Sequence, residues 1–268
     1  MRHLLPFLQR HPLPVQAFFR HSLVLTYAFP ERVLTPLLPP GLVLDGFKGL
    51  GFLAIAVVQT EGLRPVGVPA ALGQDFFLTG YRIFSRFHTA AGRNLRGLRI
   101  LRSDTDRALM ASFGNLLTHY KYTRCDARMV EQDGLLEVAI DTGGAADLHV
   151  LADLAGKPAA LPAGSPFANL REARAFAGPL PFTFDYEPET HSIVRIEGVR
   201  QHWDPQPVAV EVRRCTFLEH PPFAGERPVL ANAFHLQDVP YRWRRGVREL
   251  LPPASRPERP RVAAVAGE

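Results

Sequence analysis

Hydrophobic residues recur along this chain in short segments that are rich in Val, Ile, Phe, Tyr and Leu. Many of these segments alternate apolar and polar positions, which is the pattern of a half-buried β-strand. Turn residues separate them at the spacing of a sandwich or barrel, not of βαβ units. The clearest predicted strands cover residues 22–27, 51–59, 81–88, 135–140, 191–199 and 208–212.

Two or three short helices are expected to interrupt the strands. The first covers residues 30–38, where Pro30 suits the first helical position. The second covers residues 105–117, with Ser103 as its N-cap. The third covers residues 167–176. The pattern therefore predicts an α+β fold, mostly β, as an antiparallel β-barrel or sandwich with two or three short helices.

Length and composition favour one domain. The 268 residues, 46% of them hydrophobic, can bury a full-sized core within a single β domain over residues 17–250. Residues 1–16 are predicted to form an N-terminal extension, because prolines interrupt them. Residues 251–268 are predicted to be a disordered C-terminal tail, because they are rich in Pro, Arg and Ala. Two small halves are the alternative organisation.

Two features indicate a cytoplasmic protein. No window offers the roughly 18 unbroken apolar residues that a bilayer span requires, so no membrane partner is expected. Cys125 and Cys215 are the only cysteines and lie far apart in the sequence, which favours neither a disulfide framework nor a thiolate zinc site.

The formal net charge of +5 comes from an excess of arginine, since only three of the 31 basic residues are lysines: Lys48, Lys121 and Lys157. A run of arginines at positions 93, 96, 99 and 102 invites a nucleic-acid interpretation. A hairpin is the better prediction there, because Gly92 and Gly97 interrupt the run, and the arginines are then expected to be solvated on a sheet. No nucleic-acid partner is therefore predicted.

The common catalytic and cofactor motifs are absent from the sequence. It contains no phosphate-binding glycine loop, dinucleotide fingerprint, G-x-S-x-G elbow or H-E-x-x-H zinc motif, so neither a cofactor nor a metal is expected. Three carboxylates, Asp185, Glu187 and Glu189, flank Pro188 and are interpreted as a charged turn.

Lys121 is the best candidate for chemistry. It lies in a β-favouring stretch from Leu116 to Cys125, in which alternate residues share a face. One face then carries His119, Lys121, Thr123 and Cys125, and the other carries Tyr120, Tyr122 and Arg124. The alternation does not decide which of these faces is turned to the barrel interior.

Four stretches, in this order and spacing, carry a resemblance to a known family: LTYAFPERVLTPLLPPGLVLDG, DFFLTGYRIFSRF, LRGLRILRSDTD and GNLLTHYKY. They resemble the YqjF-like conserved bacterial family, also described as domain of unknown function 2071. This family is a branch of the acetoacetate decarboxylase-like superfamily, and the resemblance covers roughly residues 17–245. It implies an acetoacetate decarboxylase-like β domain.

The resemblance also implies site residues. In acetoacetate decarboxylases a Pro-Lys-Lys motif carries the lysine that forms a Schiff base with a ketone. Tyr120, Lys121 and Tyr122 match these three positions. Arg20 matches an arginine that lines the family's site, whereas the site glutamate falls at Leu78. The resemblance therefore implies Lys121 and Arg20 as catalytic residues and leaves two of the family's helper groups unmatched.

A Schiff base requires a neutral amine, so the pKa of Lys121 would have to fall by about three units through a nearby cation or burial. Arg20 could be that cation, and burial beside Tyr122 and Phe84 could add desolvation. Arg20 or Arg82 would also suit a substrate carboxylate through a two-pronged hydrogen bond. The candidate substrate-binding residues are His119, Tyr122, Arg82 and Phe84.

Two functions follow, and the sequence ranks them almost level. The first is a Schiff-base lyase that decarboxylates, cleaves or dehydrates a small oxo-acid at Lys121. The second is a non-catalytic β-barrel that binds a small apolar or aromatic anion, because the usual site is incomplete and 18 phenylalanines are available to line a cavity. A small-molecule carboxylate or oxo-acid is the expected partner in both, and assembly into a homo-oligomer is left open.

Overall fold

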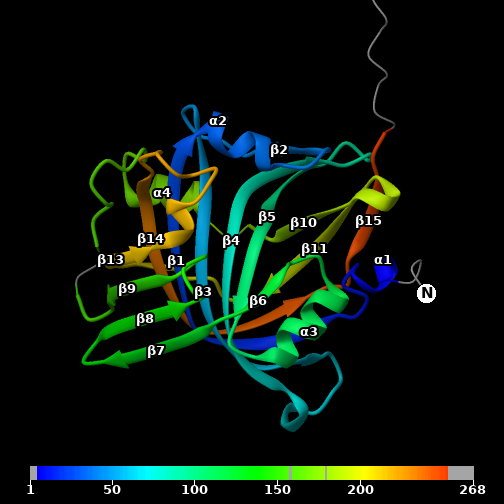
Figure 1. The fold of residues 1–268 in the computed structure, drawn as a ribbon, viewed down its shortest axis with the longest axis horizontal. Coiled ribbons are helices and arrows are strands. Elements are labelled where there is room, and N and C mark those ends of the chain that lie inside the picture. The colour runs from blue at the N-terminus through cyan, green and yellow to red at the C-terminus, as the bar shows by residue number, and fades with distance from the viewer. Residues whose placement is uncertain (1–4, 157–158, 179, 253–268) are drawn as a thin grey trace, which may run out of the picture.

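The structure is a computed structural model that describes residues 5–156, 159–178 and 180–252. Two sheets make up most of this part of the chain (Figure 1). The large sheet contains β1 (Val15–Pro30), β2 (Leu42–Leu44), β3 (Leu50–Pro65), β4 (Gln74–His88), β5 (Asn94–Thr105), β6 (Tyr122–Arg124), β10 (Phe182–Glu187), β11 (Ser192–Arg200), β12 (Gln206–Pro207), β14 (Val229–Trp243) and β15 (Val247–Leu250). The small sheet contains β7 (Asp126–Gln132), β8 (Leu135–Asp141), β9 (Leu148–Asp153) and β13 (Ala209–Cys215).

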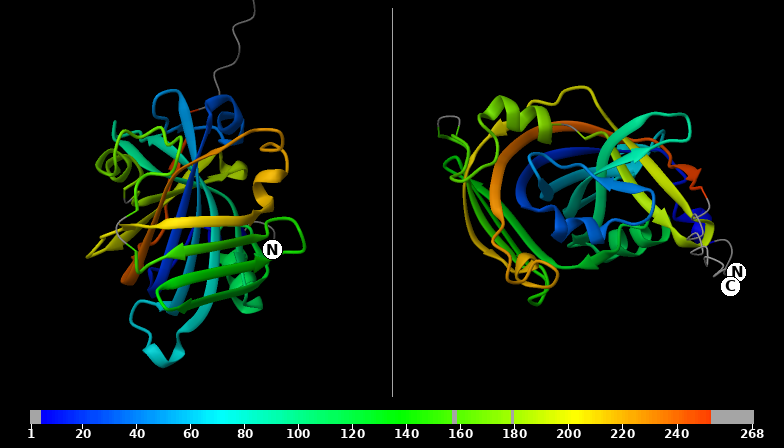
Figure 2. Two further views of the ribbon diagram at one scale, coloured as in Figure 1. Left: turned by 90° about the vertical axis from the view of Figure 1, so that its left-hand side faces the viewer. Right: turned by 90° about the horizontal axis from the view of Figure 1, so that it is seen from above.

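The large sheet closes on itself. Its strands follow the order β14-β1-β3-β4-β5-β10-β11, and β11 pairs again with β14, for example at Gly198 and Trp243. All neighbours in this ring are antiparallel except β5 and β10. Seen from above, the strands curve into a rounded enclosure (Figure 2, right). The predicted α+β, mostly β class is confirmed, and closure of the ring gives the barrel an interior face.

Short helices join the strands. They are α1 (Leu5–Leu8), α2 (Glu31–Leu34), α3 (Ala108–Leu117) and α4 (Leu170–Ala177), together with 3₁₀ turns η1 (Thr35–Leu37), η2 (Ala70–Leu72), η3 (Pro188–Thr190) and η4 (Thr216–Glu219). The helix predicted at 30–38 is found as α2 followed by η1. The helix predicted at 167–176 is found as α4, which begins after Asn169, whose side chain accepts a hydrogen bond from the backbone N–H of Glu172.

The predicted start of the central helix is wrong. Ser103, expected to be its N-cap, lies inside β5 and pairs with Gly80 of β4 and Tyr122 of β6. The strand therefore continues through Thr105, and α3 begins only at Ala108. Pairing on both sides of β5 overrides the local capping signal, because it satisfies the same backbone groups.

The charged turn predicted around Pro188 is also wrong for two of its three carboxylates. Asp185 and Glu187 lie in β10 and are fully buried. Asp185 pairs with Arg99 at 3.0 Å, and Glu187 accepts two hydrogen bonds from Arg10. Only Glu189 lies in a turn, η3.

Three of the four arginines expected to be solvated form ion pairs with buried carboxylates instead, and Arg93 is exposed as expected. Arg96 donates from Nε to Asp45 at 2.6 Å, and Arg102 donates to Asp104 at 2.8 Å. Both carboxylates are completely buried. The arginine run thus neutralises carboxylates inside the fold, and little of it is left to face a nucleic acid.

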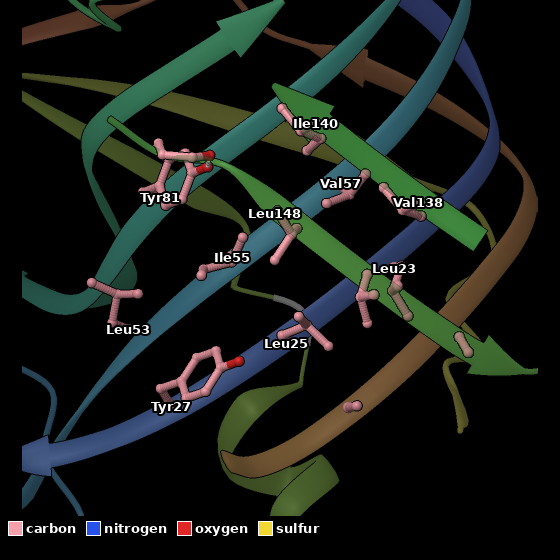
Figure 3. Close-up of a cluster of buried hydrophobic side chains, with 14 of the residues drawn as sticks. Leu23, Leu25, Tyr27, Leu53, Ile55, Val57, Tyr81, Val138, Ile140 and Leu148 are labelled. Carbon is pink, nitrogen blue, oxygen red and sulfur yellow. Dashed lines mark hydrogen bonds between the residues drawn. The ribbon is translucent and has the colours of Figure 1, made fainter. Parts of the chain in front are cut away.

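The main hydrophobic core lies between the barrel and the small sheet. One face of β1, β3 and β4 packs against β8 and β9 (Figure 3). Leu25, Ile55 and Ile83 from the barrel are completely buried there, as are Leu136 and Val150 from the small sheet. Because side chains alternate along a strand, the other face of β1, β3 and β4 is turned into the barrel.

The remaining sequence predictions concern the strands, the two ends of the chain and a membrane span. Each predicted strand lies within, or largely overlaps, an observed strand, and β1, β3 and β4 are longer than predicted. The predicted N-terminal extension contains α1 and the first residues of β1, and most of the predicted disordered tail, from residue 253 on, lies outside the described residues. In the part of the chain that the structure describes, no helix is long and apolar enough to cross a membrane.

Candidate functional site

The barrel encloses a cavity of about 610 Å³, a size typical of small-molecule sites. Its walls come from the inward faces of β1, β3, β4, β5 and β14, and α3 lies beside it. The lining is mostly apolar: small residues such as Ala54 and Ala56 on β3 face Phe76, Leu78 and Phe84 on β4. These residues leave room for an apolar ligand.

The charges around the cavity all have one sign. Three arginines line it, Arg64, Arg82 and Arg200. None of the described lining residues is an aspartate or a glutamate. Arg64, near the edge, already donates hydrogen bonds to the backbone carbonyls of Val68 and Gly62. Arg82 and Arg200 are therefore the candidates for binding an anion.

Among the residues that the structure describes, Arg82 has no counter-ion. Its Nε atom is buried and has no hydrogen-bond partner in the described structure. Burial lowers the pKa of the guanidinium from its usual value, and three phenol groups, not carboxylates, act in the opposite direction. Guanidinium nevertheless stays charged at neutral pH. An unpaired cation in an apolar cavity costs free energy, and a bound anion would remove that cost.

The phenols near Arg82 belong to Tyr120, Tyr122 and Tyr241, and all three line the cavity. Burial raises the pKa of Tyr120 and of Tyr122, so both keep their hydroxyl protons at neutral pH. Tyr120 also has a buried hydroxyl without a hydrogen-bond partner. A guanidinium and protonated phenols are all donors, so this part of the cavity favours a ligand that supplies acceptors.

Arg200 extends the donor-rich region. Its Nη1 donates to the hydroxyl of Tyr241 at 3.1 Å, and its guanidinium lies 4.2 Å from the ring centre of Trp203. Because the Tyr241 oxygen accepts this bond, its own proton is left to donate to a ligand. The indole Nε1 of Trp203 is also buried without a partner. Arg200, Tyr241 and Trp203 therefore form a second group of donors in the wall.

The sequence places Arg82 by two local features. On β4 the residues Phe76, Leu78, Gly80, Arg82 and Phe84 alternate with the core-facing residues, so they share the inward face. Gly80 has no side chain, and the Arg82 guanidinium folds back over it: a Cβ atom built on Gly80 would lie 2.6 Å from Arg82 Nε and 2.8 Å from Nη2. The guanidinium thus occupies the space that any other residue at position 80 would fill.

A second polar cluster lies behind the cavity wall. Asp185 projects from the same face of β10 as Thr183, which lines the cavity. Its pKa is raised by burial, while Arg99, His119 and Lys121 lower it. Asp185 Oδ2 and His119 Nε2 are buried without partners. These groups neutralise one another behind Tyr120 and do not line the cavity.

The two residues predicted to be catalytic are not brought together in the cavity. Lys121 is exposed, has a left-handed backbone with φ 54°, and lies just before β6, not within a strand. Arg20 is half-exposed and forms ion pairs with Glu61 at 3.1 Å and Asp238 at 2.6 Å. Neither Lys121 nor Arg20 is among the residues that line the cavity.

Three of the four predicted substrate-binding residues line the cavity, and one does not. Tyr122, Arg82 and Phe84 line the cavity, whereas His119 belongs to the cluster behind the wall. Leu78, at the position expected for the family's glutamate, also lines the cavity, so an apolar side chain stands where the resemblance implies an acid. Among the described residues, no group of three or more His, Cys, Asp or Glu side chains could hold a metal ion.

Sequence reasoning missed Gly80, Arg200, Trp203 and Tyr241. A signal was available only for Gly80, because a glycine inside a strand pattern indicates a close approach by another group. The other three come from β11, the loop after it and β14. They meet only because β11 pairs with β14, and no local pattern predicts that contact.

Solved structures with the same architecture are enzymes and enzyme-like proteins. Acetoacetate decarboxylase from Legionella pneumophila matches with a TM-score of 0.58 at 10% identity, over 88% of this chain and 87% of that chain. An acetoacetate decarboxylase-like enzyme from Sphingomonas wittichii RW1 matches with a TM-score of 0.55 at 17% identity, over 91% and 96%. The enduracididine biosynthesis enzyme MppR, complexed with pyruvate, matches with a TM-score of 0.56 at 14% identity, over 88% and 90%.

These matches define an acetoacetate decarboxylase-like fold, as the sequence resemblance implied. The sequence model of DUF2071, a family of uncharacterized conserved proteins, matches residues 16–238. Because this match covers most of the chain, the protein belongs to the DUF2071 family. No curated protein matches the chain by sequence.

Proposed function

We propose that the barrel binds the carboxylate of an amphipathic small molecule, with Arg82 as its counter-ion. One observation carries the proposal: Arg82 lies in an apolar cavity whose described lining contains no carboxylate. A guanidinium matches a carboxylate in shape and can donate two parallel hydrogen bonds to it. The apolar walls supply the contacts for the rest of the ligand.

The neighbouring groups support a carboxylate over a neutral ligand. Tyr120, Tyr122 and Tyr241 can each donate a hydroxyl proton towards the region of Arg82. No carboxylate is among the described lining residues, and Asp185, which lies near Tyr120 and Tyr122 behind the wall, pairs with Arg99. A ligand with acceptor atoms at one end and an apolar body satisfies both parts of the cavity. A cytoplasmic location stays a prediction from the sequence.

The proposal is tested by calorimetric titration of the full-length protein with aliphatic carboxylates and with primary alcohols of equal chain length. We expect each carboxylate to bind at least about tenfold more tightly than its alcohol, because hydrogen bonds to charged groups contribute about 1.5–3 kcal/mol. Equal affinities for both series, or binding of neither, would contradict a carboxylate site.

The second function is a Schiff-base lyase with Lys121 as nucleophile and Arg20 as carboxylate anchor. It is favoured by the fold shared with acetoacetate decarboxylase and by the MppR structure with pyruvate. In our structure Lys121 is exposed, and Arg20 already has two carboxylate partners. The binding function therefore has more support from the geometry.

Borohydride trapping separates the two functions. We expect that reduction in the presence of pyruvate or acetoacetate leaves no adduct on Lys121, because Lys121 is exposed and lies outside the cavity lining. Peptide mass analysis measures the adduct, and Lys121→Ala is the control for labelling elsewhere. Stoichiometric labelling of Lys121 that the substitution abolishes would favour the lyase.

A further inference from the structure

We propose that the ligand is a long-chain aliphatic monocarboxylate that binds head-first, with its carboxylate at Arg82 and its chain directed to the cavity mouth. This inference rests on the proposed carboxylate site and names the class of ligand and its direction. It is drawn from the shape of the cavity, the depth of Arg82 and the residues at the rim.

The cavity is elongated along the strands. Its lining runs from Val15 to Thr26 on β1, from Ala54 to Pro65 on β3, and from Gln74 to Phe84 on β4. A strand rises about 3.3 Å per residue, so the lining extends over roughly 30 Å. A volume of about 610 Å³ spread over that length makes a narrow channel. A narrow channel suits a flexible chain better than a compact ring system.

The Arg82 guanidinium lies part of the way along this channel. It folds over Gly80, which pairs with Ala56 on β3, and Ala56 pairs with Val24 on β1. On β4, Gln74 lies six positions before Gly80, or about 20 Å along the strand. Phe84 lies four positions after Gly80, or about 13 Å in the other direction. The channel therefore has a longer arm towards Gln74 and a shorter arm towards Phe84.

The stretch of the longer arm next to Arg82 has apolar walls, and Arg200 lies further along it, beside Tyr241. Val58 and Leu78 are paired neighbours on β3 and β4 in this stretch, and Phe76 and Leu63 follow them. Beside them the rings of Phe19 and Tyr241 stack with centres 4.7 Å apart. An alkyl chain placed along the apolar residues would bury its methylene groups, which is favourable. The chain would pass Arg200, whose guanidinium donates to the Tyr241 hydroxyl and lies over the Trp203 ring.

The longer arm ends at an exposed apolar rim. Four lining residues are more than half exposed: Leu13 at 52%, Leu72 at 74%, Leu109 at 55% and Phe113 at 53%. They come from the segment before β1, from η2 and from α3, which lie together at the lower end of the barrel (Figure 1). α3 carries no charged residue, and its Leu116 adds to the same exposed surface.

Contiguous exposed apolar side chains mark a binding surface. Here the exposed rim residues also line the channel. A ligand held wholly inside the channel would not contact them, so their exposure favours a ligand that reaches the mouth. A chain that runs from Arg82 to the mouth would lie against the four rim residues and explain their exposure. The shorter arm ends instead at Phe84 and Ala177, which are buried, and at Leu98 and Leu180, which are half-buried, so none of these is as exposed as the rim residues.

A chain-length series tests the class of ligand. Full-length protein is titrated with butanoate, octanoate, dodecanoate and hexadecanoate below their critical micelle concentrations. We expect the Kd to fall by about fourfold for each added methylene until the chain reaches the rim. If every carboxylate binds with similar affinity, the long-chain inference fails and the carboxylate site stands. If no carboxylate binds, the proposed function itself fails.

Two matched substitutions test the direction of the chain. Val58→Phe places a phenyl ring in the longer arm, and Ala54→Phe places one in the shorter arm, near Arg82 itself. Both rings enter open cavity space, and thermal denaturation checks that both variants fold. We expect Val58→Phe to weaken hexadecanoate by more than tenfold while butanoate binds as before, and Ala54→Phe to leave the chain-length dependence unchanged. The reverse pattern, or no effect of either, would overturn the head-first direction.

The rim is tested by Leu72→Ser, with Leu135→Ser as its control, since Leu135 is 44% exposed on β8 in the small sheet. We expect only Leu72→Ser to weaken hexadecanoate severalfold, and neither to alter butanoate. If Leu72→Ser leaves hexadecanoate binding unchanged, the chain does not reach the rim. If Leu72→Ser and Leu135→Ser weaken hexadecanoate binding equally, the loss of affinity is not specific to the cavity mouth. Either result contradicts the inference.

Discussion

Arg82→Met is expected to weaken carboxylate binding by roughly 30-fold to several thousand-fold, because removing one partner of a buried charge pair costs about 2–5 kcal/mol. The same substitution is expected to raise the stability of the ligand-free protein, by about 1 kcal/mol or more, since it replaces an unpaired cation with an apolar side chain of similar length. Titration calorimetry and urea unfolding measure the two effects. Unchanged affinity, or a loss of stability, would mean that Arg82 serves the fold and not a ligand.

Gly80→Ala provides the matched control for this result. The added Cβ would lie within 3 Å of the Arg82 guanidinium, which is the movable end of a side chain, so the strand can accept it. Gly80→Ala is expected to weaken carboxylate binding when Arg82 is present. It is expected to change carboxylate binding little in the Arg82→Met variant. A double-mutant cycle measures this coupling. Equal losses in both backgrounds would show that Gly80 acts on the cavity by another route.

The buried pair His21 and His235 is expected to destabilise the protein below pH 6.5. Nδ1 of His21 lies 3.1 Å from Nε2 of His235, across β1 and β14, and both side chains are buried. Burial, followed by the charge of His21, lowers the pKa of His235 to about 4. Between pH 6.5 and 4 the unfolded chain therefore binds a proton that the folded chain does not.

The contribution of neutral His235 to the free energy of unfolding is fully present above pH 6.5. It decreases as the pH falls and changes no further below about pH 4. The total loss is about 3 kcal/mol. His235→Gln keeps a hydrogen-bonding side chain and removes the titration, so wild type should lose about that much relative to the variant between pH 7.5 and 4. Urea unfolding at both pH values measures it. Parallel pH curves for the two proteins would refute the assignment.

The comparison with a variant is needed because another buried group acts in the opposite direction. Burial raises the pKa of Asp104 to about 6. Its folded state therefore takes up a proton before the unfolded state does, and this contribution grows in favour of folding as the pH falls from 6 to about 4. Only the difference between wild type and His235→Gln isolates the histidine.

The site illustrates how far alternation can be used. Period-two alternation separated Tyr120 and Tyr122 from Lys121, but Lys121 lies before β6 with a left-handed backbone, so strand alternation does not account for its exposure. It could not say which face is inward, because both faces of these strands are covered. Tyr120 and Tyr122 line the cavity, whereas Lys121 is exposed.

Charge pairs show a second limit. Asp185 and Glu187 resembled a turn, because Pro188 and further polar residues surround them in the sequence. Their partners, Arg99 and Arg10, are 86 and 177 residues away. A buried carboxylate is acceptable only when such a partner is present, and local sequence contains no information on that partner.

By itself, the sequence determined a mostly β domain with short helices and the alternating faces of its main strands. These properties are local, because they depend on side-chain spacing along one strand. Only the tertiary structure decided that the face of Arg82 is the barrel interior and that Lys121 lies outside it. The reason is the pairing of β11 with β14, which closes the ring and brings Arg200 and Tyr241 into the same cavity. Closure depends on backbone hydrogen bonds between strands far apart in the chain, and no local pattern specifies them.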